Sequence, residues 1–252
     1  MTNSGERDGA PRPTALVTGG NKGLGKEVSR RLAARGMSVL LTARDEERGR
    51  AAAAELAAEG GDIRFARLDV TEEKSVRSVA ELVGASFGRL DILVNNAGVN
   101  GVVRGERRTL DEMSVEMLRS TLETNFVGAF ALTQALLPAL RTAGGRVVNV
   151  TSALATFART TGSGPAGRAD LIAYCASKVA LNMTSVLLAD QLREWGVTVC
   201  AVSPGYVATD MNNFAGTKTV QEGARTIVHF ATLAPDELPD RAFLTEDGVA
   251  PW

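Results

Sequence analysis

The chain has 252 residues, of which 44% are hydrophobic and 23% charged, and this globular composition excludes a largely disordered protein. The formal net charge of −1 argues against a protein built to bind nucleic acid or an anionic membrane. No apolar run approaches about 18 residues, so no transmembrane helix is expected. Two cysteines are too few for a disulfide framework, which favours a reducing, cytoplasmic location. A single histidine excludes a multi-histidine metal site, and no metal is expected.

The predicted elements alternate between strands and helices along the chain. Residues 1–13 are polar and are expected to form a flexible tail, followed by one domain over residues 14–252. About seven strands are predicted, at 15–18, 38–43, 63–68, 91–95, 146–150, 197–202 and 241–245. The first helix is predicted to end at residue 35, and further helices at 45–59, 72–87, 111–140 (as one long helix), 170–194 and 220–233.

This order predicts an α/β fold with one doubly wound parallel sheet and helices on both faces. The strand interiors are nearly continuous apolar runs, as expected for strands that are covered on both sides. Ligands of such sheets bind beyond the carboxyl ends of the strands. The motifs that follow the strands are therefore the candidate site residues.

The first predicted strand runs into a glycine-rich turn with glycines at 19, 23 and 25. Glycines let the backbone turn sharply and approach a pyrophosphate, and the N-terminus of the next helix supplies unpaired N–H groups. We therefore expect a dinucleotide to contact Gly19, Asn21, Lys22, Gly23 and Leu24. The alternative is an ordinary tight turn between a strand and a helix.

The end of the second strand favours NADPH over NADH. An acidic residue there would bind the ribose 2′-hydroxyl, whereas an arginine accepts a 2′-phosphate. Arg44 follows this strand, Arg48 lies one helical turn later, and Lys22 is a third cation within the glycine loop. Asp45 is expected to cap the helix. The alternative is that both arginines are simply solvated at the start of that helix.

Two further motifs end predicted strands where an adenosine would lie. Asp69 and Val70 follow the third strand, and Asp69 is expected to bind the adenine, to cap the helix that begins at 72, or both. Asn96, Ala97 and Gly98 follow the fourth strand. Their small side chains allow close approach of a cofactor, while the asparagine can join neighbouring loops.

Tyr174 and Lys178 are four residues apart in a predicted helix and therefore share one face. A nearby ammonium favours a phenolate, so Lys178 is expected to lower the pKa of Tyr174 and to let it exchange a proton with a carbonyl oxygen or an alcohol. Ser152 ends the fifth strand and is expected to hydrogen-bond the substrate carbonyl. Asn125, in an apolar part of the long helix, needs a partner, which a water-linked proton path to Lys178 would supply.

In this order, the motifs resemble those of the short-chain dehydrogenase/reductase family over residues 14–245, and especially its carbonyl-reductase-like branch. The resemblance implies a Rossmann-like fold, a nicotinamide cofactor and a catalytic tetrad that falls on Asn125, Ser152, Tyr174 and Lys178. It also implies that Lys178 holds the nicotinamide ribose and that Tyr174 is the acid/base. The remaining cofactor contacts that it implies are Pro204, Gly205, Val207 and Thr209.

Two departures from the family pattern affect the substrate site. The stretch from Ser152 to Tyr174 is longer than usual, yet shorter than the insertion of monomeric carbonyl reductases, and the segment after Val207 is short. Family members usually pair through the helices predicted at 111–140 and 170–194, whereas this branch often stays monomeric. The sequence therefore leaves monomer and homodimer open, with a slight preference for the monomer.

The sequence thus predicts an NADPH-dependent reductase that converts a ketone or aldehyde to an alcohol, with Tyr174 as proton donor. The expected partner is a small-molecule carbonyl substrate, and neither nucleic acid nor a membrane. Two alternatives stay open: an alcohol dehydrogenase that works in the oxidative direction, and a non-catalytic NADP(H)-binding regulator. The loops at 99–110, 153–170 and 207–219 are expected to line the substrate pocket, and their sequence does not specify the substrate.

Overall fold

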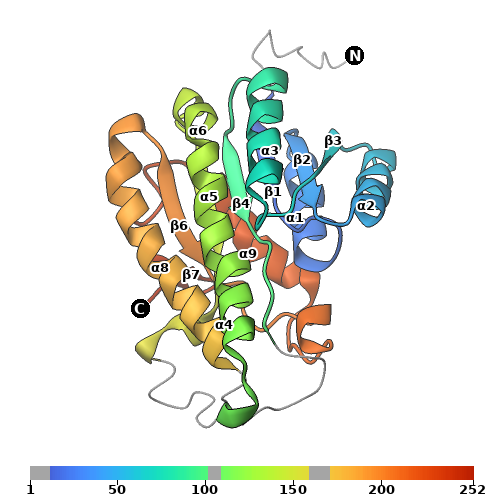
Figure 1. Cartoon of the computed structure of the whole chain (residues 1–252). Coiled ribbons are helices and arrows are strands. Elements are labelled where there is room, and N and C mark those ends of the chain that lie inside the picture. Colours follow the sequence, from blue (N-terminus) through green and yellow to red (C-terminus); the bar gives the residue numbers. More distant parts are fainter. Residues whose placement is uncertain (1–11, 102–108, 159–170) are drawn as a thin grey trace, which may run out of the picture.

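The computed structural model describes residues 12–101, 109–158 and 171–252. One sheet of eight strands forms its centre, in the order β3-β2-β1-β4-β5-β6-β7-β8 (Figure 1). The strands are β1 (Thr14–Val17), β2 (Ser38–Ala43), β3 (Ile63–Arg67), β4 (Ile92–Asn95), β5 (Arg146–Val150), β6 (Thr198–Val202), β7 (Phe243–Thr245) and β8 (Gly248–Ala250). All neighbours pair in parallel except β7 and β8, so the carboxyl ends of β1 to β7 lie at one edge.

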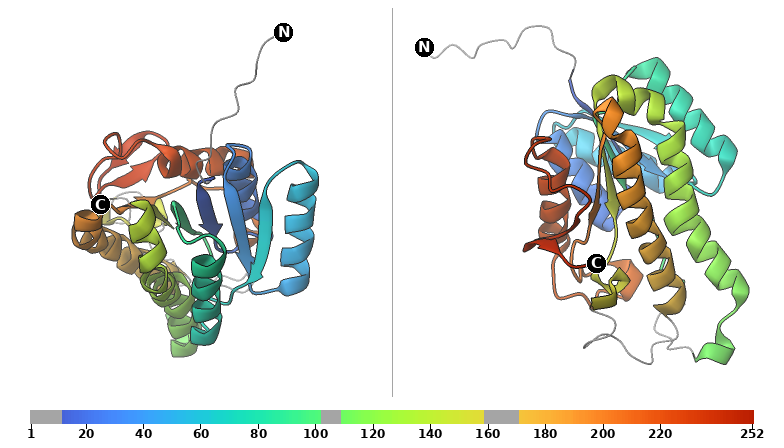
Figure 2. Two further views of the ribbon diagram at one scale, coloured as in Figure 1. Left: turned by 90° about the horizontal axis from the view of Figure 1, so that it is seen from above. Right: turned by 90° about the vertical axis from the view of Figure 1, so that its left-hand side faces the viewer.

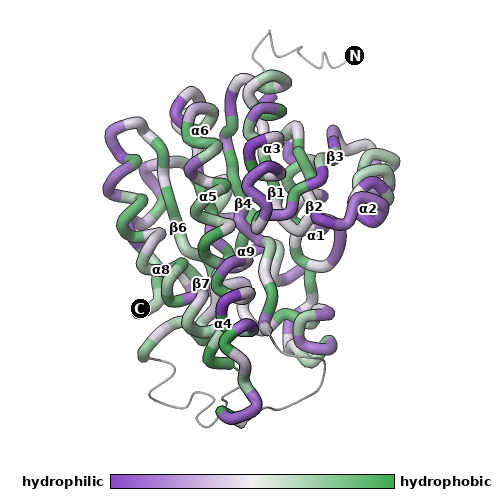
Figure 3. The backbone as a smooth tube through the Cα atoms, in the orientation of Figure 1, coloured by the Kyte–Doolittle hydropathy of each residue, from purple (hydrophilic) through white to green (hydrophobic). Residues whose placement is uncertain are grey.

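Helices cover both faces of the sheet (Figure 2). One face packs against α1 (Gly23–Ala33), α2 (Glu46–Ala58) and α9 (Val220–Thr232), and the other against α3 (Glu73–Ser86), α5 (Gly128–Ala135), α6 (Leu137–Ala143) and α8 (Ile172–Leu192). Successive strand residues point to opposite faces. Val17 and Val39 therefore join the core beneath α1 and α9, while Leu16 and Leu40 join the core beneath α3 and α5. Hydrophobic residues follow the central strands in Figure 3.

The doubly wound α/β fold is confirmed, with eight strands rather than about seven. β8 was not predicted, because it has only three residues and so shows no alternating pattern. It pairs antiparallel with β7 and ends the sheet. Of the expected tail at 1–13, residues 1–11 lie outside the described residues.

The prediction of one helix over 111–140 is wrong. The chain instead forms a 3₁₀ turn, η1 (Leu110–Glu112), then α4 (Val115–Leu122), a π-helical turn, η2 (Glu123–Val127), α5 and α6. α6 is bent by 61° from the preceding helical stretch. Pro138 explains this break, because it has no N–H to continue a helix but suits the first turn of a new one, where it lies in α6.

By length and apolar composition, Ile172–Trp195 would be able to cross a membrane, and so would the bent stretch from Val115 to Ala143 if counted as one span. The core helix of a globular protein meets the same criterion. α8, which forms most of Ile172–Trp195, packs on the sheet and buries Ser177, Lys178 and Asn182. This feature is weak evidence for a membrane span, and the expected absence of a membrane partner stays a prediction.

Candidate active site

Most of the predicted site residues gather at the carboxyl edge of the sheet. The glycine-rich turn follows β1, Arg44 follows β2, Asn96 follows β4, Ser152 follows β5 and the 204–209 segment follows β6. The parallel register explains this, because it brings the ends of neighbouring strands to one edge. The tyrosine and lysine reach the same edge from α8.

The glycine-rich turn is tied to the loop after β4. Asn96 Nδ2 donates to the carbonyl oxygen of Thr18 at 2.8 Å. The Thr18 hydroxyl accepts hydrogen bonds from the N–H groups of Asn96 and Ala97, at 2.9 and 2.8 Å. An asparagine therefore joins the two loops, as the sequence predicted.

The backbone of this turn has the shape of a cradle for a phosphate. Gly19 and Gly23 have φ values of 65° and 51°, in the left-handed region that favours glycine. A Cβ on Gly25 would lie 2.4 Å from the carbonyl oxygen of Gly19, so only glycine lets the turn fold back on the start of α1. The N-terminus of α1 begins here, and its dipole favours an anion. These residues fit a dinucleotide.

The predicted cations lie at two places on this edge. Arg44 and Arg48 are exposed at the start of α2, which Asp45 caps as predicted by accepting a hydrogen bond from the N–H of Arg48 (3.0 Å). Lys22 lies in the glycine turn, where its Nζ is 3.1 Å from Asp210 Oδ2. Sequence reasoning did not anticipate this ion pair.

Asp69 lies beside Arg44. Its carboxylate accepts hydrogen bonds from the N–H and hydroxyl of Thr71, and these bonds, with the charge of Arg44, hold its pKa below the ordinary value although burial raises it. Asp69 does not cap the next helix, because Glu72 occupies the N-cap position of α3. Val70 is buried against Gly128 of α5. The adenine contact of Asp69 stays a prediction.

The segment after β6 and the start of α1 both pack against α9. A Cβ on Gly223 of α9 would lie 2.4 Å from Val207 Cγ2 and 3.2 Å from Leu24 Cδ1. The absence of a side chain at Gly223 therefore leaves room for both of these side chains. Thr209 caps the short turn η6 (Asp210–Asn212) through a capping box. The structure thus places Leu24, Val207 and Thr209 around one end of the cradle, with Pro204 and Gly205 just before them.

Ser152, Tyr174 and Lys178 meet in a small cluster. The Ser152 side chain lies next to the phenol of Tyr174. Lys178 is 4% exposed, and its Nζ donates to the carbonyl oxygen of Val150 at 2.8 Å. The same Nζ lies over the Tyr174 ring, 5.8 Å from its centroid. The predicted proximity of these three residues is therefore present.

The pKa values of this cluster differ from the predicted pattern. Burial raises the pKa of Tyr174, and the hydrogen bond to Ser152 opposes the rise only in part. Burial also lowers the pKa of Lys178, to about 8. The expected lowering of the pKa of Tyr174 is not found in this structure, because loss of solvation is the largest effect on the phenol.

Asn125 is buried in η2, and its side chain is bound by protein groups. Its Nδ2 donates to the carbonyl oxygen of Val99 (2.8 Å) and to Ser177 Oγ (2.9 Å), while its Oδ1 accepts from the N–H of Val99 (2.8 Å). Protein groups therefore supply partners for this side chain, and the water-linked path to Lys178 stays a prediction. The Asn125 amide holds the loop after β4 against α8.

These contacts give a site with two halves. One half offers backbone and cationic groups suited to a dinucleotide, and the other offers a hydroxyl pair backed by a buried ammonium, suited to proton exchange with an oxygen atom. A family model for short chain dehydrogenases matches residues 13–219. The chain belongs to this family.

Relatives of this short-chain dehydrogenase share most of its length. Carbonyl reductase [NADPH] 1 of Mus musculus is 34% identical, with 96% of this chain and 99% of that protein covered. (+)-Neomenthol dehydrogenase of Arabidopsis thaliana is 32% identical, with 94% and 97% covered. The NADPH-bound carbonyl reductase from chicken fatty liver superposes with a TM-score of 0.83 at 27% identity, covering 96% of this chain and 100% of that one. The carbonyl-reductase-like resemblance is thereby confirmed.

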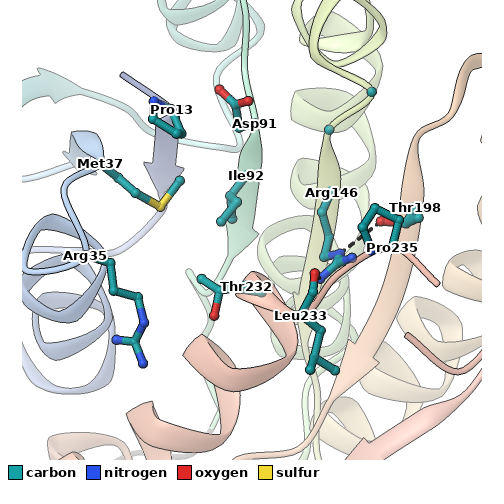
Figure 4. A pocket seen from close by; sticks show the side chains of 13 residues that line it. Pro13, Arg35, Met37, Asp91, Ile92, Arg146, Thr198, Thr232, Leu233 and Pro235 are labelled. Atoms are coloured by element: carbon teal, nitrogen blue, oxygen red, sulfur yellow. Dashed lines mark hydrogen bonds between the residues drawn. The ribbon is translucent and has the colours of Figure 1, made fainter. Parts of the chain in front are cut away.

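A cavity of about 360 Å³ lies at the opposite, amino-terminal edge of the sheet (Figure 4). Arg146, buried at the start of β5, donates to Thr198 Oγ1 (2.9 Å) and to the carbonyl oxygens of Phe230 and Leu233 (both 2.8 Å). Burial lowers the pKa of Arg146. Its contacts with the C-terminal end of α9 indicate a structural cap, and no predicted site residue lines this cavity.

Three contributors to the site were not predicted: Thr18, Ser177 and Asp210. Ser177 falls inside the tyrosine–lysine motif, three residues after Tyr174, so helical spacing would have placed it near that face. Thr18 directly follows β1, where a hydroxyl after an apolar run was a signal. Nothing local marks Asp210. Parts of the 99–110 and 153–170 loops lie outside the described residues.

Proposed function

We propose that this chain is an NADPH-dependent reductase that converts a ketone or aldehyde to an alcohol. The observation that carries the proposal is that Ser152 and Tyr174 lie together, backed by buried Lys178, at the edge where the glycine cradle lies. The relatives named carbonyl reductase [NADPH] support both the enzyme class and the cofactor.

The cofactor is assigned to residues that the structure places along this edge. The glycine turn would hold the pyrophosphate, Asp69 and Val70 the adenine, and Arg44, Arg48 and Lys22 the 2′-phosphate. Asn96, Ala97 and Gly98 would border the middle of the cofactor, and Pro204, Gly205, Val207 and Thr209 its nicotinamide end. When bound, NADPH supplies the hydride that is added to the carbonyl carbon.

The chain's own residues handle the substrate oxygen. Tyr174 donates its proton to this oxygen, and the Ser152 hydroxyl hydrogen-bonds the same atom and polarises the carbonyl. Lys178, whose pKa is about 8, stays protonated at neutral pH. One of its N–H groups donates to the carbonyl oxygen of Val150. We assign the other two to the nicotinamide ribose and to the surroundings of the Tyr174 phenol. Asn125 is assigned to hold the loop that carries Gly98.

The burial of Tyr174 suits the role of a proton donor. Burial raises its pKa, so the phenol is protonated at neutral pH and able to donate to a carbonyl oxygen. A non-catalytic regulator would not need a serine, tyrosine and lysine in mutual contact. The regulator is therefore the weaker candidate.

The assembly stays open between monomer and homodimer, as predicted. The outer faces of α5 and α8 expose Phe130 (40%), Met183 (61%) and Leu187 (58%), which leaves a surface for a twofold mate. We keep the monomer as the first expectation. Light scattering at micromolar concentration tests this, since the chain mass is 26.5 kDa and a tetramer would contradict both options. A cytoplasmic location is part of the same proposal.

The decisive assay is a panel of ketones, aldehydes and quinones, followed through NADPH absorbance and repeated with NADH. We expect turnover of at least one carbonyl class with NADPH and much weaker turnover with NADH. Turnover only of alcohols with NADP⁺ would support the oxidative alternative. Tight NADPH binding without turnover across the panel would support the regulator.

A further inference from the structure

Ser177 connects the catalytic helix to the π-helical turn. Its hydroxyl is fully buried, donates to the carbonyl oxygen of Tyr174 at 2.7 Å and accepts from Asn125 Nδ2 at 2.9 Å. The Asn125 amide in turn binds both backbone groups of Val99. One hydroxyl therefore links the backbone of the proposed proton donor to the loop that borders the proposed cofactor site.

This link also fixes the surroundings of Lys178. A Cβ on Gly98 would lie 3.2 Å from Asn125 Oδ1 and 3.6 Å from Lys178 Nζ, so the amide and the ammonium converge on Gly98. Ser177 lies between Tyr174 and Lys178 in α8. A small rotation of α8 would carry both side chains away from Ser152 and Gly98 together, and the bond from Ser177 to Asn125 opposes this rotation.

We infer that Ser177 is a positioning residue of the proposed reductase site, holding Tyr174 and Lys178 in register with Asn125. The inference rests on the proposed function for its activity measurement. Ser177 does not reach the reacting atoms in this assignment; it acts through Asn125 and through the backbone of Tyr174.

The same helix supplies a matched control in Ser185. Ser185 is also buried, donates to the carbonyl oxygen of Leu181 at 2.7 Å, and accepts from Asn149 Nδ2 at 2.8 Å. Asn149 lies within β5, in the core rather than at the site. Ser185→Ala thus removes the same two kinds of hydrogen bond from the same helix without touching Asn125.

The first test compares Ser177→Ala with Ser185→Ala by thermal unfolding, NADPH affinity and kcat. Each change leaves one buried asparagine amide short of a partner, so we expect similar losses in Tm. We expect Ser177→Ala to lower kcat by about tenfold and Ser185→Ala by less than about twofold, with NADPH affinity unchanged in Ser185→Ala. Equal effects on kcat would overturn the inference.

A double-mutant cycle with Asn125→Ala tests the route of the effect. If Ser177 acts through Asn125, adding Ser177→Ala to Asn125→Ala lowers kcat by less than about twofold further. Fully multiplicative losses would overturn the inference. Should Ser177→Ala not fold, Ser177→Cys keeps the volume with weaker hydrogen bonding, and an unchanged kcat in that variant would overturn it as well.

A titration separates this inference from the proposed function. The chain has two tyrosines, so in a Tyr206→Phe background the phenolate absorbance reports Tyr174 alone. We expect Ser177→Ala to shift the apparent pKa of Tyr174 and Ser185→Ala to leave it unchanged. Failure of the wild type to reduce any carbonyl compound would overturn the proposed function, whereas an unchanged titration in Ser177→Ala would overturn the positioning role.

Discussion

Lys22 Nζ lies 3.1 Å from Asp210 Oδ2, so an ion pair joins the glycine turn before α1 to the short turn after β6. Both side chains are partly exposed, which limits such a pair to about 1 kcal/mol or less. Lys22 is also one of the three cations assigned to the 2′-phosphate of NADPH. Asp210 and that phosphate therefore compete for one ammonium group.

Asp210→Asn is expected to strengthen NADPH binding by about two- to fivefold, because Lys22 no longer has to leave a carboxylate. NADH affinity should stay unchanged, since NADH has no 2′-phosphate. Fluorescence titration with both cofactors measures this. Glu246→Gln is the control, because it removes the pair with Lys218 on the same side of the fold. Weaker NADPH binding in Asp210→Asn would mean that Asp210 holds Lys22 in its working position instead.

Arg44→Asp is expected to erase or invert the preference for NADPH. The change removes a cation from the end of β2 and introduces a carboxylate that suits the ribose 2′-hydroxyl of NADH. One charge-assisted contact is worth about 1.5–3 kcal/mol, so the NADPH-to-NADH ratio of kcat/KM should fall by at least about tenfold. Arg50→Asp, on the nearby helix α2, controls for the general loss of positive charge. An unchanged ratio would show that Arg44 does not bind the phosphate.

The position of the candidate site was predictable because its motifs end buried parallel strands. Apolar runs mark such strands in the sequence. Because parallel strands have their carboxyl ends at the same edge of the sheet, Ser152, Asn96 and Arg44 come to one edge. The break near Pro138 was missed because apolar spacing continues across it, and a proline in a first helical turn resembles one inside a longer helix.

The finer properties of the site depend on contacts between residues that are far apart in sequence. Asn125 is bound by Val99 and Ser177, and neither partner follows from helical spacing around Asn125. The pKa of Tyr174 depends on how deeply the fold buries it, which the spacing to Lys178 does not reveal. Sequence therefore predicted which residues meet, but not how they are bound.

Burial of Lys178 makes the stability of the fold depend on pH. Its pKa falls from 10.5 in the unfolded chain to about 8 in the folded protein. Between pH 8 and pH 10.5 the unfolded chain therefore binds more protons than the folded protein, and the free energy of unfolding rises with pH. Relative to Lys178→Met, the wild type should therefore gain about 2 kcal/mol in free energy of unfolding between pH 7 and pH 10. Urea unfolding at both pH values measures the difference. A constant difference would show that Lys178 is not desolvated in the fold.

The phenol of Tyr174 is expected to ionise above its ordinary pKa of about 10 in the cofactor-free protein, because burial disfavours the phenolate. Absorbance titration of the Tyr206→Phe variant follows Tyr174 alone. Ser152→Ala should raise the pKa further, since the Ser152 hydroxyl stabilises the phenolate. A transition well below 10 would show instead that Lys178 already dominates the environment of the ring.

The central assignment is Tyr174 as proton donor, and Tyr174→Phe tests it most directly. The substitution keeps the ring and removes only the hydroxyl that lies next to Ser152. We expect an NADPH dissociation constant within about twofold of wild type, together with a loss of at least about a hundredfold in kcat for carbonyl reduction. Near-normal turnover by this variant, with NADPH still bound, would contradict the assignment of Tyr174 and with it the proposed mechanism.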